Sequence, residues 1–148
     1  MSDILFVRDI MSSPVKAVRE DTSLHEVIAV LSNFGINAVV VVRGDRPVGI
    51  VTTKDALVRG YEHGLPVREL TAGMVASSPL VTIDQETDVV EAAKLMRQKG
   101  IRHLPVTSGD KLVGIISDLD IVFSVPSLLS AMEEVCRPRQ PATATSTH

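Results

Sequence analysis

A hydroxyl and a carboxylate stand three residues apart at two places, in Thr52-Thr53-Lys54-Asp55 and in Ser117-Asp118-Leu119-Asp120. Both pairs follow an apolar run, where a strand is expected to give way to a helix. The hydroxyl and the free amides of the helix start can bind a phosphate, while the carboxylate can accept hydrogen bonds from a vicinal diol. A ribose phosphate carries both groups, so the two motifs indicate a site for such a ligand.

The same spacing also has a purely structural interpretation. Ser/Thr-x-x-Asp is close to a capping box, in which the hydroxyl caps the helix and the acid interacts favourably with the helix dipole. The spacing alone leaves both interpretations open.

Two potential cations, Arg102 and His103, precede an apolar stretch in the second half of the chain, whereas the first half has Asn37 and Ala38 at the equivalent place. Such cations are often ordinary surface charge. Near a symmetry axis, however, they would neutralise phosphate groups. Their absence from the first half predicts two unequal sites.

Familiar catalytic motifs are missing from the sequence. There is no phosphate-binding loop of the Gly-x-x-x-x-Gly-Lys-Ser/Thr type and no Gly-x-Gly-x-x-Gly fingerprint, and the four histidines do not stand at metal-binding spacings. The single cysteine, Cys136, precedes Arg137, which would favour a lowered thiol pKa. An enzyme that uses Cys136 is therefore a third hypothesis, although a lone cysteine is usually a small apolar residue.

The sequence pattern of the elements that would position these residues occurs twice in the chain. Shifting the sequence by 65 positions superposes two stretches without a gap, so that Pro14 meets Pro79 and Asp55 meets Asp120. A period of this length, present twice, predicts one pseudo-symmetric domain made from a duplicated unit.

Each copy shows the same order of elements. Short alternating strands are expected at residues 15–18 and 80–83, followed by helices that begin near Ser23 and Asp88 and end at Gly35 and Gly100. Two strands then follow in each copy, at residues 38–42 and 48–52 and at residues 104–106 and 113–117, and a short helix closes the unit. The pattern predicts an α+β fold of two β-α-β-β-α repeats packed face to face.

The domain organisation follows from this pattern. We expect repeat one at residues 8–59, a linker at 60–72, repeat two at 73–124, an amphipathic helix at 125–136 and a disordered tail at 137–148. The apolar residues Leu57, Val58, Ile121 and Val122 are expected near the outer edge of the module, which predicts a homodimer.

Composition limits the class of partner. The chain has 148 residues, a net charge of −3 and 3% aromatic residues, so neither a positive field nor a stacking platform for nucleic acid is expected. No apolar run approaches the length of a membrane helix, and one cysteine cannot form an intrachain disulfide. We expect a cytoplasmic protein without a membrane partner.

As a whole, the duplicated pattern resembles a tandem pair of cystathionine β-synthase (CBS) domains, also called a Bateman module. The resemblance covers roughly Arg8 to Ser124 and lies in the Ser-x-Pro starts, the Gly-Ile helix ends, and the Gly-Ile-Val/Ile-Ser/Thr-x-x-Asp motifs. It implies two clefts that bind adenosine-containing ligands such as AMP, ADP, ATP or S-adenosylmethionine, with no cofactor required and no metal. It also implies a dimer of such pairs.

The resemblance assigns residues to each cleft. One cleft would use Asp120 for the ribose and Ser117, Arg102 and His103 for phosphate, with Ser12, Pro14, Val15 and Ala17 along the base and Asn37 and Ala38 at the far rim. The mirror cleft would use Asp55, Thr52 and Lys54 with Ser77, Pro79, Leu80 and Thr82.

Together these features predict a non-catalytic regulatory module that senses an adenosine-type ligand and signals its occupancy to an effector protein by a conformational change. The alternative is a ligand-free dimerisation or interaction module whose aspartates only cap helices.

Overall fold

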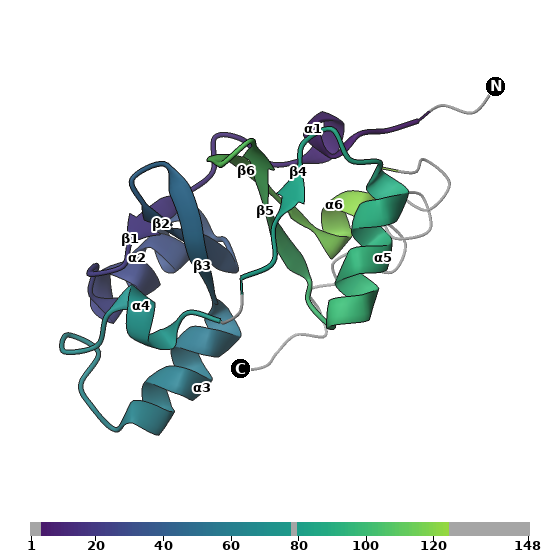
Figure 1. Cartoon of the computed structure of the whole chain (residues 1–148). Helices are drawn as coiled ribbons and strands as arrows, with labels where there is room; N and C mark the ends of the chain where they lie inside the picture. Colours follow the sequence, from purple (N-terminus) through teal and green to yellow (C-terminus); the bar gives the residue numbers. More distant parts are fainter. Residues whose placement is uncertain (1–3, 78–79, 125–148) are drawn as a thin grey trace, which may run out of the picture.

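The structure is a computed structural model that describes residues 4–77 and 80–124 (Figure 1). Its first half contains α1 (Val7–Ile10), β1 (Ala17–Arg19), α2 (Leu24–Phe34), β2 (Ala38–Arg43), β3 (Arg46–Thr52) and α3 (Thr53–His63). Its second half contains α4 (Ala72–Val75), β4 (Ile83–Asp84), α5 (Val89–Lys99), β5 (His103–Ser108), β6 (Lys111–Ser117) and α6 (Asp118–Val122). The predicted α+β fold of two equivalent repeats is confirmed. The predicted tail helix and tail, and Cys136 with them, lie outside the described residues.

Each repeat has a three-stranded sheet with the same topology. β1 pairs parallel with β2, which pairs antiparallel with β3, and β4, β5 and β6 repeat this order. Gly44 and Gly109 turn the hairpins with φ angles of 64° and 65°, a conformation that glycine adopts without strain. The first strands begin later than predicted, at Ala17 and Ile83, because their parallel pairing starts only opposite Val40 and Val106.

Helices α2 and α5 follow the predicted caps. The Ser23 hydroxyl accepts a hydrogen bond from the Glu26 amide at 3.1 Å, and the Asp88 carboxylate accepts one from the Val90 amide at 2.7 Å. Gly35 and Gly100 end the helices in the left-handed conformation. The buried residues of α2 and α5 pack in the cores of their own repeats.

The two shortest helices pack on the opposite repeat. In Figure 1, α1 lies beside β4–β6 and α4 lies beside β1–β3. Val7 of α1 is fully buried in the core of the second repeat, and Ala72 and Val75 of α4 are fully buried in the core of the first. The crossing is symmetric. The Val7 amide donates to the Thr87 carbonyl at 2.8 Å, and the equivalent residues of the other repeat, Ala72 and Thr22, make the same hydrogen bond at the same distance.

Helix α3 continues through Gly60, the residue at which we expect the linker to begin, and ends at His63 before Gly64. A Cβ atom at Gly60 would lie 3.1 Å from Leu24 Cδ2, so the glycine allows α3 to approach α2 closely. Leu70, further along the expected linker, is fully buried in the first core. The segment between the repeats is therefore helical at its start, and it contributes Leu70 to the first core.

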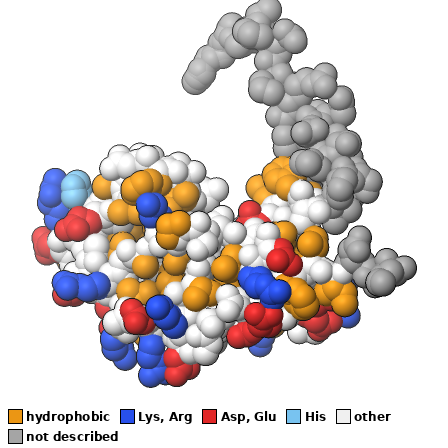
Figure 2. Space-filling view, turned by 90° about the horizontal axis from the view of Figure 1, so that it is seen from above, with side chains coloured by type: hydrophobic (Ala, Val, Ile, Leu, Met, Phe, Trp, Pro, Cys, Tyr) orange, Lys and Arg blue, Asp and Glu red, His pale blue; other side chains and the backbone are white. Residues whose placement is uncertain are grey.

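The repeats meet through β3 and β6. Each strand also has a glycine where a segment outside the two strands approaches it: a Cβ atom at Gly49 would lie 2.9 Å from Ala76 Cβ, and one at Gly114 would lie 2.9 Å from the Ser12 carbonyl oxygen. Figure 2 shows Lys and Arg interspersed with Asp and Glu around one face, with hydrophobic side chains between them. The Ser/Thr-x-x-Asp motifs begin at the C-terminal ends of β3 and β6, and they lie at the junction between the repeats.

Candidate functional site

A cavity of about 800 Å³ lies between the two repeats. Both strand-to-helix junctions line it, together with the entry to β5 and the segment that leads into β4. Its lining residues are Asn37, Ile50, Thr52, Thr53, Lys54, Asp55, Ser77, Val81, Gly100, Ile101, Arg102, His103, Ser117, Asp118 and Leu119. The pseudo-symmetric arrangement therefore produces a shared site that neither repeat contains by itself.

Both Ser/Thr-x-x-Asp motifs form complete capping boxes. The Thr52 amide donates to Asp55 Oδ2 at 2.9 Å, and the Asp55 amide donates to Thr52 Oγ1 at 3.1 Å. Ser117 and Asp120 make the same pair of hydrogen bonds at 2.8 and 3.2 Å. The capping interpretation is therefore correct for both motifs, and any ligand must use the hydrogen-bonding capacity that remains.

The two capped aspartates differ in their further partners. The Ser77 hydroxyl donates to Asp55 Oδ2 at 2.9 Å, and Arg59 Nε lies 3.6 Å from Asp55 Oδ1. The Asp55 side chain is only 13% exposed, and it lines the cavity, whereas Asp120 does not. Asp55 is thus an oriented, charge-compensated carboxylate in the cavity wall.

The entries to β2 and β5 are tied to the starts of α3 and α6. The Thr53 amide donates to the Asn37 carbonyl at 2.9 Å, and the Asp118 amide donates to the Arg102 carbonyl at 3.0 Å. Arg102 Nε lies 4.0 Å from Asp118 Oδ2, which is a long ion pair. Backbone contacts therefore hold residues 37 and 102 at the cavity while the Arg102 guanidinium keeps most of its hydrogen-bonding capacity.

His103 is partly buried in the cavity wall. Burial lowers the pKa of His103 below its ordinary value of 6.5, and the nearby Arg102 adds to this effect, while Asp118 and Asp120 oppose it. His103 is consequently a neutral hydrogen-bonding group near pH 7 rather than a cation.

The cavity takes up residues from both predicted clefts. It brings together Thr52, Lys54, Asp55 and Ser77 of one predicted set with Asn37, Arg102, His103 and Ser117 of the other. The remaining described candidates do not line it: Ser12, Pro14, Val15, Ala17, Ala38, Leu80, Thr82 and Asp120. Pro79 lies outside the described residues.

Two of these candidates are occupied by the fold itself. The Ser12 amide donates to the Ile115 carbonyl at 2.8 Å and the Ser12 carbonyl accepts from the Ile115 amide at 3.1 Å, so the amide is not available to a base and the carbonyl keeps only its second lone pair. Ala38 is 8% exposed within β2.

Sequence reasoning missed several lining residues. Thr53, Asp118 and Leu119 lie inside the two motifs, and Gly100 and Ile101 form the repeated helix end, so the repeat itself carried a signal for them. Ile50 and Val81 are apolar residues whose sequence pattern resembles that of the core.

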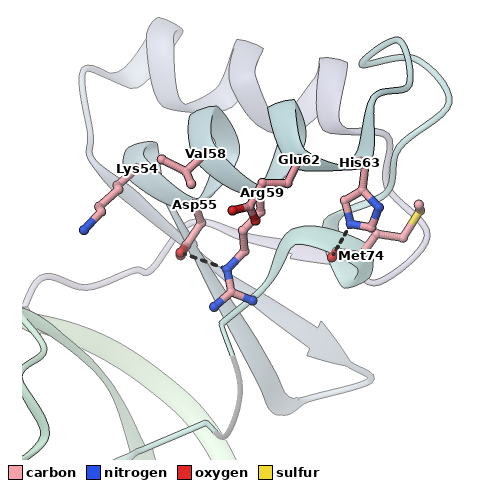
Figure 3. A pocket seen from close by; sticks show the side chains of 7 residues that line it. All are labelled: Lys54, Asp55, Val58, Arg59, Glu62, His63 and Met74. Atoms are coloured by element: carbon pink, nitrogen blue, oxygen red, sulfur yellow. Dashed lines mark hydrogen bonds and ion pairs between the residues drawn. The ribbon is translucent and has the colours of Figure 1, made fainter.

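A second cavity of about 460 Å³ lies along α3 (Figure 3). Figure 3 shows the Arg59 side chain turned toward Asp55 and the His63 ring against the Met74 carbonyl. Arg59 also donates to the Ala76 carbonyl at 3.2 Å. Asp55 and Lys54 line both cavities, so they stand in the wall between them.

Within residues 4–77 and 80–124, no three His, Cys, Asp or Glu side chains gather in a group that could hold a metal ion. The same part of the chain contains no helix with the length and apolar character needed to span a bilayer.

A family model of the CBS domain matches residues 7–61 and again residues 67–127. An uncharacterized protein of Methanopyrus kandleri is 36% identical over 111 residues, which cover 74% of this chain and 57% of that protein. Hypoxic response protein 1 of Mycobacterium tuberculosis is 28% identical over 134 residues, 88% of this chain and 94% of the relative. The chain spans 57% and 66% of the length of two archaeal relatives that it matches.

Solved structures share the fold. The crystal structure of Hypoxic Response Protein I with two coordinated zinc ions has a TM-score of 0.76 at 29% identity, over 82% of this chain and 100% of that chain. The CBS domain pair of protein MJ0100, in complex with 5′-methylthioadenosine and S-adenosyl-L-methionine, has a TM-score of 0.73 at 23% identity. That likeness covers 88% of this chain and 99% of the other, and it concerns the fold alone.

Proposed function

The chain belongs to the CBS domain family, and from this membership and the cavity between its repeats we propose a non-catalytic regulatory module that binds an adenosine-containing ligand. Binding would change how the two repeats meet, and an effector protein would respond to that change. AMP, ADP, ATP and S-adenosylmethionine are the candidate ligands.

One observation carries the proposal: residues of both repeats line a single cavity that combines hydroxyls, two carboxylates and cations. Its volume of about 800 Å³ lies within the range of small-molecule sites, roughly 300–1,000 Å³. Thr52 and Ser117 offer hydroxyls, Asp55 offers a carboxylate, and Lys54 and Arg102 offer positive charge. A ligand in this cavity would touch both repeats, as a sensor that acts on their junction requires. The MJ0100 domain pair, which shares this fold, was solved in complex with 5′-methylthioadenosine and S-adenosyl-L-methionine, and this supports the proposal.

A ligand-free interaction module is the second candidate function, and the capping boxes are the observation that favours it. Asp55 and Asp120 both already serve their own helices. On this alternative the motifs stabilise α3 and α6, and the cavity holds only water.

Calorimetric titration of the whole protein with AMP, ATP and S-adenosylmethionine separates the two functions. The regulatory proposal predicts saturable heat for at least one of them, and deoxyadenosine nucleotides should bind more weakly because one hydroxyl of the diol is missing. A folded protein that gives no binding heat with any of these ligands would favour the interaction module.

We also propose that the protein is a cytoplasmic homodimer. The exposed apolar side chains of α3, among them Leu57 at 72% and Tyr61 at 86%, support an interface, because groups of such side chains usually mark contact surfaces. A single cysteine in the sequence agrees with a reducing compartment.

A further inference from the structure

We propose that residues 125–136 of the chain fold back over Leu5 and Ile4 and close the core of the second repeat, as α3 closes the core of the first. The proposal goes beyond the proposed function, since it concerns a contact within the chain and needs no ligand. The segment itself lies outside the described residues, and its docking place follows from a comparison of the two described repeats.

Leu5 is exposed where its counterpart is buried. At the 65-residue offset Leu5 corresponds to Leu70, and the two residues make the same backbone contact. The Leu5 carbonyl accepts a hydrogen bond from the Val89 amide at 2.9 Å, and the Leu70 carbonyl accepts one from the Leu24 amide at 2.8 Å. Leu70 is fully buried, while Leu5 is 36% exposed. The two leucines therefore have the same position in their repeats but differ in what covers them.

The second half of α3 covers Leu70. A Cβ atom at Gly60 would lie 3.9 Å from Leu70 Cδ1, and α3 extends past Gly60, whereas α6 ends at Val122. The position equivalent to Gly60 is residue 125, the first one after the described part of repeat two. Because α6 contacts α5 as α3 contacts α2, we expect the residues from 125 onward to cover Leu5.

The residue types at this place are matched within each repeat. Gly60 is equivalent to Val125, and Leu24 is equivalent to Val89. A Cβ atom at Gly60 would lie only 3.1 Å from Leu24 Cδ2, so the larger leucine requires the glycine. In repeat two the smaller Val89 leaves room for a side chain at residue 125. A smaller residue on α5 thus accompanies a larger residue at position 125, which indicates that the two positions are in contact.

Ile4 extends the apolar surface of the second repeat beyond Leu5. Ile4 is 58% exposed, and its counterpart, Glu69, is an exposed charged residue. Repeat one presents a charge to solvent at the place where repeat two presents an aliphatic side chain. Repeat two therefore needs a cover that reaches further than the one supplied by α3.

The sequence after Ser124 provides such a cover. Pro126 suits the first turn of a helix, and apolar residues follow at helical spacing. This stripe consists of Leu128, Leu129, Met132 and Val135. The family model ends at residue 127, so most of the stripe is a feature of this chain beyond the repeat pattern.

The position of the segment favours the chain itself over a separate partner. A helix over residues 125–136 would be about 18 Å long, and it would begin next to Leu5, so it can reach Ile4. A tethered segment has a higher effective concentration at an adjacent surface than a separate molecule has.

Amide hydrogen exchange in the full chain, followed by NMR, tests the proposal with an internal control. Leu128→Glu combined with Met132→Glu places charge on the stripe. We expect the Val89 amide to exchange about tenfold or more faster in this stripe variant, and the equivalent Leu24 amide to change by less than about twofold. Ser127→Glu combined with Ser130→Glu adds the same charge away from the stripe and should leave both amides unchanged.

A second variant alters the other side of the contact. Ile4→Glu gives this position the residue of repeat one, and it should also speed up the exchange of the Val89 amide about tenfold or more. Combined with the stripe variant it should add less than about twofold, because both changes remove the same contact.

Unchanged exchange of the Val89 amide in the stripe variant, or an equal increase at Val89 and Leu24, would overturn the proposal, since neither result reports a local contact at α5. An increase confined to α3 would place the segment on the apolar surface of that helix and would overturn it as well. Protection of the Val89 amide that is lost when the unmodified chain is diluted from dimer to monomer would assign the cover to a second copy, which also contradicts a contact within one chain.

Discussion

Asp55 and Asp120 occupy the same position of one repeated motif, yet they make different contacts in the structure. Their shared Ser/Thr-x-x-Asp spacing gave equivalent capping boxes, as the structural alternative predicted. Their further partners differ: Asp55 has Arg59 one helical turn later, where Asp120 has Ser124, and the Ser77 hydroxyl reaches Asp55 from 22 residues away. The spacing and the Arg59 difference can be read in the sequence, but the contact with Ser77 depends on the folded chain.

His103 gives a prediction about pH at the residue scale. Because burial lowers its pKa in the folded chain below 6.5, the unfolded chain binds the proton more tightly, and the free energy of unfolding falls as the pH drops below about 6.5. Above that pH the residue is neutral in both states and its effect disappears. We expect His103→Gln to reduce the loss of Tm between pH 7.5 and 5.5, as measured by calorimetry.

The unmodified chain, melted in the same buffers, provides the reference for this comparison. An unchanged pH dependence in H103Q would contradict the role assigned to burial at His103.

Among the elements, those governed by local sequence were predicted best. The caps at Ser23, Asp88, Gly35 and Gly100 and the hairpin glycines agree with the structure, because capping and turn chemistry acts within a few residues. Helices α1 and α4 were missed, since four residues are too few to show a helical period. Ile28 lies four residues after the buried Leu24, at the spacing of one apolar helix face, yet it is 40% exposed. Helical periodicity predicts which face of a helix is apolar, but it does not predict how much of that face the neighbouring elements cover.

The crossing of α1 onto the second repeat gives a prediction about stability. Val7 is fully buried in the second core, so Val7→Ala should reduce the free energy of unfolding by about 2 kcal/mol through lost burial and an unfilled cavity. Denaturant unfolding measures this change. The same substitution at Val90, which is 59% exposed, should change stability by less than about 0.5 kcal/mol. Equal effects at the two positions would show that α1 does not stabilise the second repeat.

For the whole molecule, the apolar surface of α3 predicts the assembly state. The sequence placed Leu57, Val58, Ile121 and Val122 at the outer edge; the first two are exposed, while Ile121 and Val122 are partly buried and Ile121 packs against the second core. We therefore expect Leu57→Glu, which adds charge to the α3 surface, to shift a homodimer toward monomer in sedimentation equilibrium at micromolar concentration. Val90→Glu on α5 is the matched control. A monomer mass for the unmodified chain would contradict the proposed dimer.

The duplicated sequence predicted the pseudo-symmetric fold, which is confirmed, whereas the two clefts and their residues were implied by the resemblance to CBS domain pairs and stay predictions. The shared cavity arises because β3 and β6 meet, bringing Arg102 and His103 together with Lys54 and Asp55. No motif in either copy records that contact, since it depends on how one complete repeat packs against the other.

A crystal structure of the whole protein grown with ATP tests the central claim most directly, because it shows both whether a nucleotide binds and where. The proposed function predicts density for a nucleotide in the cavity between the repeats, in contact with residues of both repeats. Nucleotide density elsewhere, for example in the smaller cavity along α3, or a cavity that stays free of nucleotide at saturating ATP, would contradict it.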